Sequence, residues 1–98
     1  MYVDTSAIHG KGLFAANALE AGQLIGCYKG PAVTEDGMHV LWVEEDDDTW
    51  IGYDGKNSMR YMNHSDTPNA EMYGLECYAL SNIPAGHEIT IDYGWNDT

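Results

Sequence analysis

Short runs of apolar, β-branched and aromatic residues, separated by glycine and proline, make up most of this chain. The runs expected to form strands are residues 1–8, 23–28, 39–43, 49–54, 75–83 and 87–95. Between them, residues 9–16 contain two glycines and are expected as a turn, and residues 29–37 are expected as a loop. Many short strands with this punctuation predict a mostly β fold with several small sheets rather than one large sheet.

Connecting segments and helices also leave signals. The acidic run at residues 44–48, "EEDDD", lies between two expected strands and is typical of a charged hairpin connection. The sequence "PAG" before the last expected strand predicts a tight turn. Residues 15–22 and 57–64 are each long enough for one or two helical turns, and Asn57 or Ser58 suits the N-cap of the second. We therefore expect few and short helices.

The chain has 98 residues, of which 44% are hydrophobic and 20% charged, a composition typical of one globular domain over residues 1–98. No run of about 18 apolar residues occurs, so no membrane span is expected. The first residues, "MYVDTSAIHG", lack the pattern of a secretion signal, so the expected location is the cytoplasm, or the nucleus if the source is eukaryotic or viral. Cys27 and Cys77 are too few for a disulfide scaffold and are expected as reduced thiols.

The net charge indicates which classes of partner the chain can bind. The chain has 4 basic and 16 acidic side chains, which gives a net charge of −12. Such a field repels nucleic acid, whose binding depends on lysine and arginine contacts with phosphates, so no direct nucleic-acid partner is expected. The same field attracts basic protein segments and speeds their encounter. Plain solubility accounts for the acidity equally well.

The stretch "RYMNHSDTPN", residues 60–69, carries the strongest local chemical signal. Its asparagines, serine, aspartate and proline also suit a capped helix end followed by a turn, which is the plainest alternative. A metal site is a third alternative, because His64 with Asp66 or His87 offers ligands that zinc accepts. No paired spacing of histidine or cysteine supports such a site, so no metal is predicted.

Three other stretches carry weaker signals. Residues 10–15, "GKGLFA", fit the dinucleotide fingerprint G-x-G-x-x-G/A, but no long helix follows, and Gly30 stands where that fingerprint needs an acid. The two glycines instead indicate a tight turn or a backbone that a ligand approaches closely. Residues 28–30, "YKG", are typical of a strand end before a turn. The stretch "EITIDYG", residues 88–94, ends a strand with Tyr93, whose hydroxyl is either buried or presented at the strand end.

In this order along the chain, "GKGLFA", "YKG", "RYMNHSDTPN" and "EITIDYG" resemble the SET domain of protein lysine methyltransferases. The resemblance extends over about residues 6–94, and "NHS", "PN" and "DYG" are its specific parts. It implies a SET-domain β-clip of several small curved sheets, in which the C-terminal strand threads under a preceding segment as a pseudoknot. That arrangement would bring "NHS" beside "DYG" at one site.

The resemblance also implies a cofactor, S-adenosylmethionine, and roles for the matching residues. The residues expected to bind the cofactor are Gly10, Lys11, Gly12, Arg60, Asn63 and His64. Arg60 would hold either its own segment or the cofactor. Tyr93 would be the catalytic tyrosine that faces the transferring methyl group. Tyr28 would share in catalysis and line the channel for the target lysine together with Ile91 and Trp95. Asn69 would be a structural brace of the turn.

The implied function is transfer of methyl groups from S-adenosylmethionine to a lysine side chain of a protein, with a basic or histone-like protein as the substrate. An alternative is a catalytically weak module that keeps the fold and binds the cofactor or a basic segment. A metal-binding or purely structural β domain would require the order of the motifs to be accidental.

Further details of the sequence refine this expectation. Ile91 lies two residues before Tyr93, where the family has Phe or Tyr as a switch of methylation number, so a di- or trimethylated product is expected. No cysteine cluster follows "DYG", so the zinc-bound module of larger relatives is not expected. Trp95 is the large apolar residue of the tail. It would cover the site or pack against a second copy in a homodimer, as the minimal viral relatives assemble.

Overall fold

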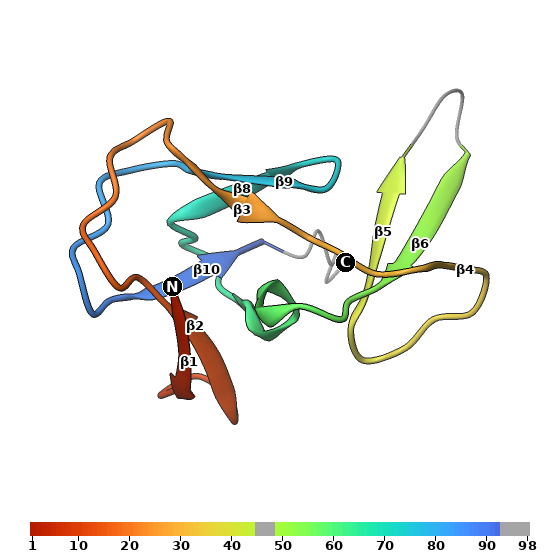
Figure 1. Cartoon of the computed structure of the whole chain (residues 1–98), viewed down its shortest axis with the longest axis horizontal. Helices are drawn as coiled ribbons and strands as arrows, with labels where there is room; N and C mark the ends of the chain where they lie inside the picture. The colour runs from red at the N-terminus through yellow and green to blue at the C-terminus, as the bar shows by residue number, and fades with distance from the viewer. Residues whose placement is uncertain (45–48, 93–98) are drawn as a thin grey trace.

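The structure is a computed structural model that describes residues 1–44 and 49–92, and strands dominate it (Figure 1). A four-stranded sheet has the order β1 (Tyr2–Thr5), β2 (Lys11–Phe14), β10 (Glu88–Ile91), β7 (Asn63–His64). β10 is antiparallel to β2 and parallel to β7. The last described strand therefore lies between strands from the beginning and the middle of the sequence.

Two three-stranded sheets complete the fold. One has the order β3 (Leu24–Cys27), β9 (Glu76–Ala79), β8 (Ala70–Tyr73). The other has the order β4 (Ala32–Val33), β6 (Trp50–Asp54), β5 (Val40–Glu44), and we call it the third sheet. Figure 1 shows the third sheet to one side of the other two. The predicted mostly β fold of several small sheets is confirmed.

Helical structure in the described chain is confined to a 3₁₀ turn, η1 (Ser58–Tyr61), inside one of the two segments predicted to be helical. Asn57 precedes it, but its side chain does not cap the turn and donates instead to the Cys27 carbonyl oxygen (2.8 Å). The prediction for residues 15–22 is wrong, because Leu19 forms a β-bridge with Ile83 there. Across residues 1–44 and 49–92 we find no helix with the length and apolar character needed to cross a membrane.

The turn predicted at residues 9–16 is wrong in its second half. Lys11–Phe14 forms β2 and pairs with β1. Leu13 in this strand is fully buried, so burial of its side chain outweighs the weak strand preference of glycine. The turn itself ends at Gly10, whose carbonyl oxygen accepts a hydrogen bond from the Ser6 N–H (2.8 Å).

β5 and β6 are the two strands predicted on either side of the acidic run. They are antiparallel, and their pairing extends to Glu44↔Trp50 at the end nearest that run. Residues 45–48 themselves lie outside the described part of the chain. β4, inside the predicted loop, and β7, inside the second segment predicted to be helical, have no counterpart among the predicted strands, and neither has β8. β8 pairs with β9, and its first residue, Ala70, is buried.

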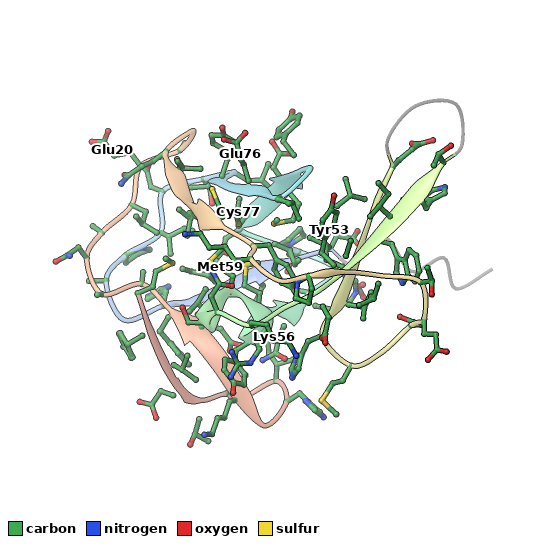
Figure 2. All side chains as sticks on the ribbon, turned by 45° about the vertical axis from the view of Figure 1, so that its right-hand side comes forward. Glu20, Tyr53, Lys56, Met59, Glu76 and Cys77 are labelled. Carbon is green, nitrogen blue, oxygen red and sulfur yellow. The ribbon has the colours of Figure 1, made fainter. Side chains whose placement is uncertain are left out.

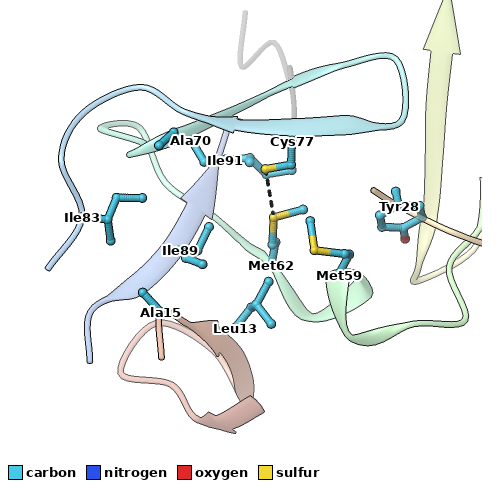
Figure 3. Close-up of a cluster of buried hydrophobic side chains, with 11 residues drawn as sticks. Leu13, Ala15, Tyr28, Met59, Met62, Ala70, Cys77, Ile83, Ile89 and Ile91 are labelled. Atoms are coloured by element: carbon cyan, nitrogen blue, oxygen red, sulfur yellow. Dashed lines mark hydrogen bonds between the residues drawn. The ribbon is translucent and has the colours of Figure 1, made fainter. Parts of the chain in front are cut away.

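The core lies between the four-stranded sheet, η1 and the β3–β9–β8 sheet (Figure 3). Its largest fully buried side chains are Leu13, Met59, Ile83, Ile89 and Cys77. Figure 2 shows Met59 and Cys77 in the interior and Glu20 at the periphery. The Cys77 thiol donates to Met62 Sδ at 3.7 Å. Burial, with a smaller contribution from the charge of Glu71, raises the pKa of the Cys77 thiol to about 12. Both cysteines are free thiols, as predicted.

The side chain of Asn69 holds β10 by two hydrogen bonds to its backbone. Nδ2 donates to the Glu88 carbonyl oxygen (2.8 Å), and the Thr90 N–H donates to Oδ1 (2.8 Å). One amide thereby supplies the donor and the acceptor that a neighbouring strand would supply. Asn69 is therefore a structural brace, but its side chain holds β10 and not the turn that it was predicted to brace.

Replacing Asn69 by Ala should lower the free energy of unfolding by about 1–3 kcal/mol, because two backbone groups of β10 lose their partners. Urea denaturation followed by circular dichroism measures the change. Asn17→Ala is the matched control, since Asn17 is exposed. If the two variants were equally stable, β10 would be held without this brace.

Candidate functional site

Three stretches far apart in the sequence meet where β2, β10 and β7 lie side by side. These are the turn that Ser6 and Gly10 close, the "NHS" stretch at Asn63, and the start of β10 at Glu88. Gly10 has a φ of +45°, a left-handed conformation that glycine adopts without strain. A Cβ at Gly10 would meet no atom within 4 Å, so the outer face of this turn is open. The Ser6 hydroxyl oxygen accepts a hydrogen bond from the Ile8 N–H (2.9 Å), which stabilises the turn from inside.

Gly12 is required for close packing against β10. A Cβ at Gly12 would lie 2.8 Å from Glu88 Cδ and 3.1 Å from Ser6 Cβ, closer than side chains pack in proteins. The same carboxylate accepts a hydrogen bond from the Ser6 hydroxyl, with its two oxygens at 2.7 and 2.9 Å. The side of Gly12 on which a Cβ would lie therefore faces the protein's own Glu88.

Asn63 links the second stretch to the first. This residue is buried, with 9% of its surface exposed. Nδ2 lies 2.8 Å from Glu88 Oε2 and 3.1 Å from the Ser6 hydroxyl oxygen. It also lies 3.2 and 3.1 Å from the carbonyl oxygens of His9 and Lys11. The structure thus brings the "GKG" and "NHS" stretches into direct contact.

Ser6 and Glu88 join Asn63 in what we call the polar cluster. Glu88 begins the "EITIDYG" stretch, but the sequence assigned no role to either residue. Glu88 carries one usable signal, because it begins a strand of otherwise buried residues, and a carboxylate at such a position needs hydrogen-bond partners. Ser6 has no comparable local signal, since its partner Glu88 is 82 residues away.

His64 lies on β7, where it is paired with Ile91 of β10. Nε2 is 3.0 Å from Asp66 Oδ1, and Nδ1 is 3.6 Å from Asp92 Oδ1. The two carboxylates approach opposite nitrogens of the ring, so the three groups do not converge on one point as metal ligands do. Throughout the described residues, no three His, Cys, Asp or Glu side chains gather as a metal site would require.

Arg60 contacts its own segment. Nη1 donates to the carbonyl oxygens of Lys56 (2.6 Å) and Asn57 (3.2 Å), and Nη2 donates to the Tyr61 hydroxyl (2.9 Å). The guanidinium carbon also lies 4.6 Å from the centre of the Tyr61 ring, within the range of a cation–π interaction. These contacts tie Arg60 to η1 and the preceding loop, so they favour the first of its two expected roles.

Of the residues expected at the lysine channel, the structure describes Tyr28 and Ile91. Tyr28 is 7% exposed, and its hydroxyl donates to the His39 carbonyl oxygen. Ile91 is 5% exposed and belongs to the core (Figure 3). The other two, Tyr93 and Trp95, lie outside the described residues. The structure thus places the predicted cofactor residues of "GKG" and "NHS" together and places Tyr28 and Ile91 in the interior.

A hollow of about 520 Å³ lies away from these residues, on the third sheet and the loop between β4 and β5. Three carboxylates line it, those of Glu35, Asp36 and Asp54. Trp42 is partly exposed, and its Nε1 donates to Asp36 Oδ1 (3.1 Å). Asp54 also forms a salt bridge with Lys56 at 2.9 Å. The third sheet therefore offers an acidic surface with an aromatic side chain beside it.

The sequence profile of the SET domain family matches residues 10–94, a range that contains all four motif stretches. This chain belongs to the SET domain family. Its fold is similar to the crystal structure of a Plasmodium falciparum protein named a "putative histone methyltransferase", with a TM-score of 0.75. That likeness covers 97% of each chain at 20% sequence identity, so it concerns the fold. The SET fold agrees with the small sheets described above.

Replacing Gly12 by Ala should lower the free energy of unfolding by about 1–3 kcal/mol, because the new methyl group displaces the Glu88 carboxylate from the polar cluster. Thermal and urea denaturation measure the loss. In the control Gly37→Ala, the methyl group meets Val40 Cγ2 at an ordinary contact distance of 3.4 Å. A Gly12→Ala variant as stable as this control would contradict the close packing of β2 against Glu88.

Proposed function

We propose that this SET-family chain is an S-adenosylmethionine-dependent protein lysine methyltransferase. The observation that carries the proposal is the hydrogen bonding of Asn63 Nδ2 to the turn before β2 and to the first residue of β2, which holds "NHS" against "GKG". These are the stretches to which the resemblance assigns the cofactor. The parallel pairing of β7 with β10 adds support, because β10 ends two residues before Tyr93.

The residues at this site suit the cofactor. Gly10 leaves the outer face of its turn open, so backbone groups there are accessible to the methionyl end. Asn63 adds a side-chain amide, and the backbone of His64 would contact the adenine end. When bound, S-adenosylmethionine supplies a methyl group activated on a positively charged sulfur.

The protein's contribution to methyl transfer would be positioning. Tyr93 would hold the lysine amine through its hydroxyl, in line with the methyl group. Tyr28 would form part of the wall around that amine, with its ring fixed by the hydrogen bond to the His39 carbonyl oxygen. No dedicated general base is needed, because a buried lysine beside a second positive charge favours its neutral form. Ile91 adds no hydroxyl near the amine, so a di- or trimethylated product stays the prediction.

A basic protein segment is the proposed substrate. Glu35, Asp36 and Asp54 line the hollow of the third sheet, and such carboxylates attract lysine and arginine side chains. Trp42, with 36% of its surface exposed, adds an aromatic face of the kind that cations approach. The net charge of −12 acts in the same direction at longer range.

A catalytically weak binding module is the second candidate. The burial of Tyr28 and Ile91 favours it, because a lysine channel needs wall residues that a substrate can reach. Cofactor binding without turnover would identify this alternative. The resemblance also predicts a homodimer. Trp95 would either pack at the dimer interface or cover the site of its own chain.

Incubation with S-adenosylmethionine that carries a labelled methyl group, and with a panel of basic proteins, should yield methylated lysine detectable by mass spectrometry. Tyr93→Phe should lower the rate by about 10²-fold, because it removes the hydroxyl that orients the amine. Calorimetry should show nearly unchanged cofactor affinity in that variant. Near-normal turnover in Tyr93→Phe would move the catalytic role to another residue, and a wild-type protein that binds no cofactor would contradict the proposal.

The double variant Glu35→Gln with Asp36→Asn should raise the KM for a basic protein substrate by about 10-fold at low salt, because it removes charges that guide the substrate. Asp36→Asn keeps an oxygen that can accept from Trp42 Nε1, so the hollow should keep its shape. The control, Glu20→Gln with Glu76→Gln, changes the net charge equally at exposed positions. Equal KM values for the two double variants would assign the effect to net charge alone.

A further inference from the structure

The orientation of the Asn63 amide is fixed by what surrounds its nitrogen. Glu88 Oε2 and the carbonyl oxygens of His9 and Lys11 accept hydrogen bonds and donate none. The fourth neighbour, the Ser6 hydroxyl, already donates its proton to Glu88. A flipped amide would place an oxygen against these acceptors, so Nδ2 must face the cluster.

The other end of the amide is therefore an oxygen turned away from Glu88. None of the described residues donates a hydrogen bond to Asn63 Oδ1, although Asn63 is only 9% exposed. No fully buried side-chain oxygen or nitrogen in the described residues lacks a partner, so Oδ1 must reach the surface. An accessible acceptor on a buried, fixed side chain is the kind of group that binds a donor on a ligand.

Glu88 is the charged member of this arrangement. Its carboxylate is held by the Ser6 hydroxyl at both oxygens and packs against Gly12, so it cannot move away without disturbing the turn. A carboxylate also forms stronger hydrogen bonds with an amide N–H than a neutral acceptor does. Glu88 is thus the charged acceptor among the groups that turn the nitrogen of the Asn63 amide inward and its oxygen outward.

We propose that Glu88 is a positioning residue, which presents Asn63 Oδ1 as the hydrogen-bond acceptor for the amino group of the cofactor's methionyl end. The inference rests on the proposed function, which supplies the cofactor. The methionyl end follows from the position of Asn63, whose Nδ2 contacts the backbone at His9 and Lys11 on either side of Gly10. Among the groups of that end, an ammonium donates to an amide oxygen, whereas a carboxylate is repelled by it.

The affinities of two ligands, measured by calorimetry, distinguish this positioning role from a merely structural one. S-adenosylhomocysteine has the amino acid portion, and 5′-methylthioadenosine lacks it. Glu88→Ala should weaken the binding of S-adenosylhomocysteine by about 10-fold, the effect of one hydrogen bond to a charged group. Binding of 5′-methylthioadenosine should change by less than about twofold. The control Glu20→Ala removes an exposed carboxylate elsewhere and should change neither affinity.

An equal loss for both ligands, or no loss in a folded Glu88→Ala variant, would overturn the inference. Circular dichroism reports folding. If Glu88→Ala does not fold, Ser6→Ala serves for the same comparison, because it removes the hydroxyl that holds the carboxylate. A selective loss of S-adenosylhomocysteine affinity in that variant would support the inference, and an equal loss or none would overturn it.

The wild-type measurement separates this inference from the proposed function. Binding of neither ligand would overturn both. Binding of the two ligands with equal affinity would leave a cofactor site in place but would overturn the role of Asn63 Oδ1, because the amino acid portion would then make no favourable contact.

Discussion

β10 is hydrogen-bonded on both sides, and the core and the polar cluster both depend on that pairing. It lies between β2 and β7, and Asn69 holds its backbone as well. The same short strand buries Ile89 and Ile91 in the core and directs Glu88 toward Ser6 and Asn63. Because these partners are far apart in the sequence, the cluster forms only when the strand near the end of the chain has joined the sheet.

Local sequence patterns predicted most strands because apolar residues and turn residues alternate on the scale of a strand. They failed at residues 11–14, where Gly10 and Gly12 indicated a turn but the burial of Leu13 and pairing with β1 and β10 decide the structure. The motif order identified Asn63 as a site residue. It assigned no role to Glu88, although this residue begins the last motif, because that role depends on contacts with residues distant in the sequence.

The polar cluster and the neighbouring core differ in how strictly they are specified. Each hydrogen bond in the cluster has a direction, and Gly12 leaves no space for rearrangement. In the core, Met59, Met62 and Cys77 supply flexible or small sulfur-containing side chains that tolerate changes in shape. Strict geometry is therefore concentrated where a ligand would be oriented, and the adaptable packing beside it would absorb small movements of β7 and β10.

Tyr28 connects this rigid region to the third sheet. The ring lies in the core, and its hydroxyl donates to the carbonyl oxygen of His39, just before β5. His39 in turn places Nδ1 3.2 Å from the Arg60 carbonyl oxygen, at η1. A substrate bound at the acidic hollow would thus contact a sheet that these two hydrogen bonds link to the core and to η1, just before "NHS". In the proposed enzyme, Tyr28 would hold the third sheet, which faces the substrate, in register with the four-stranded sheet that carries "NHS", in addition to any contact with the lysine itself.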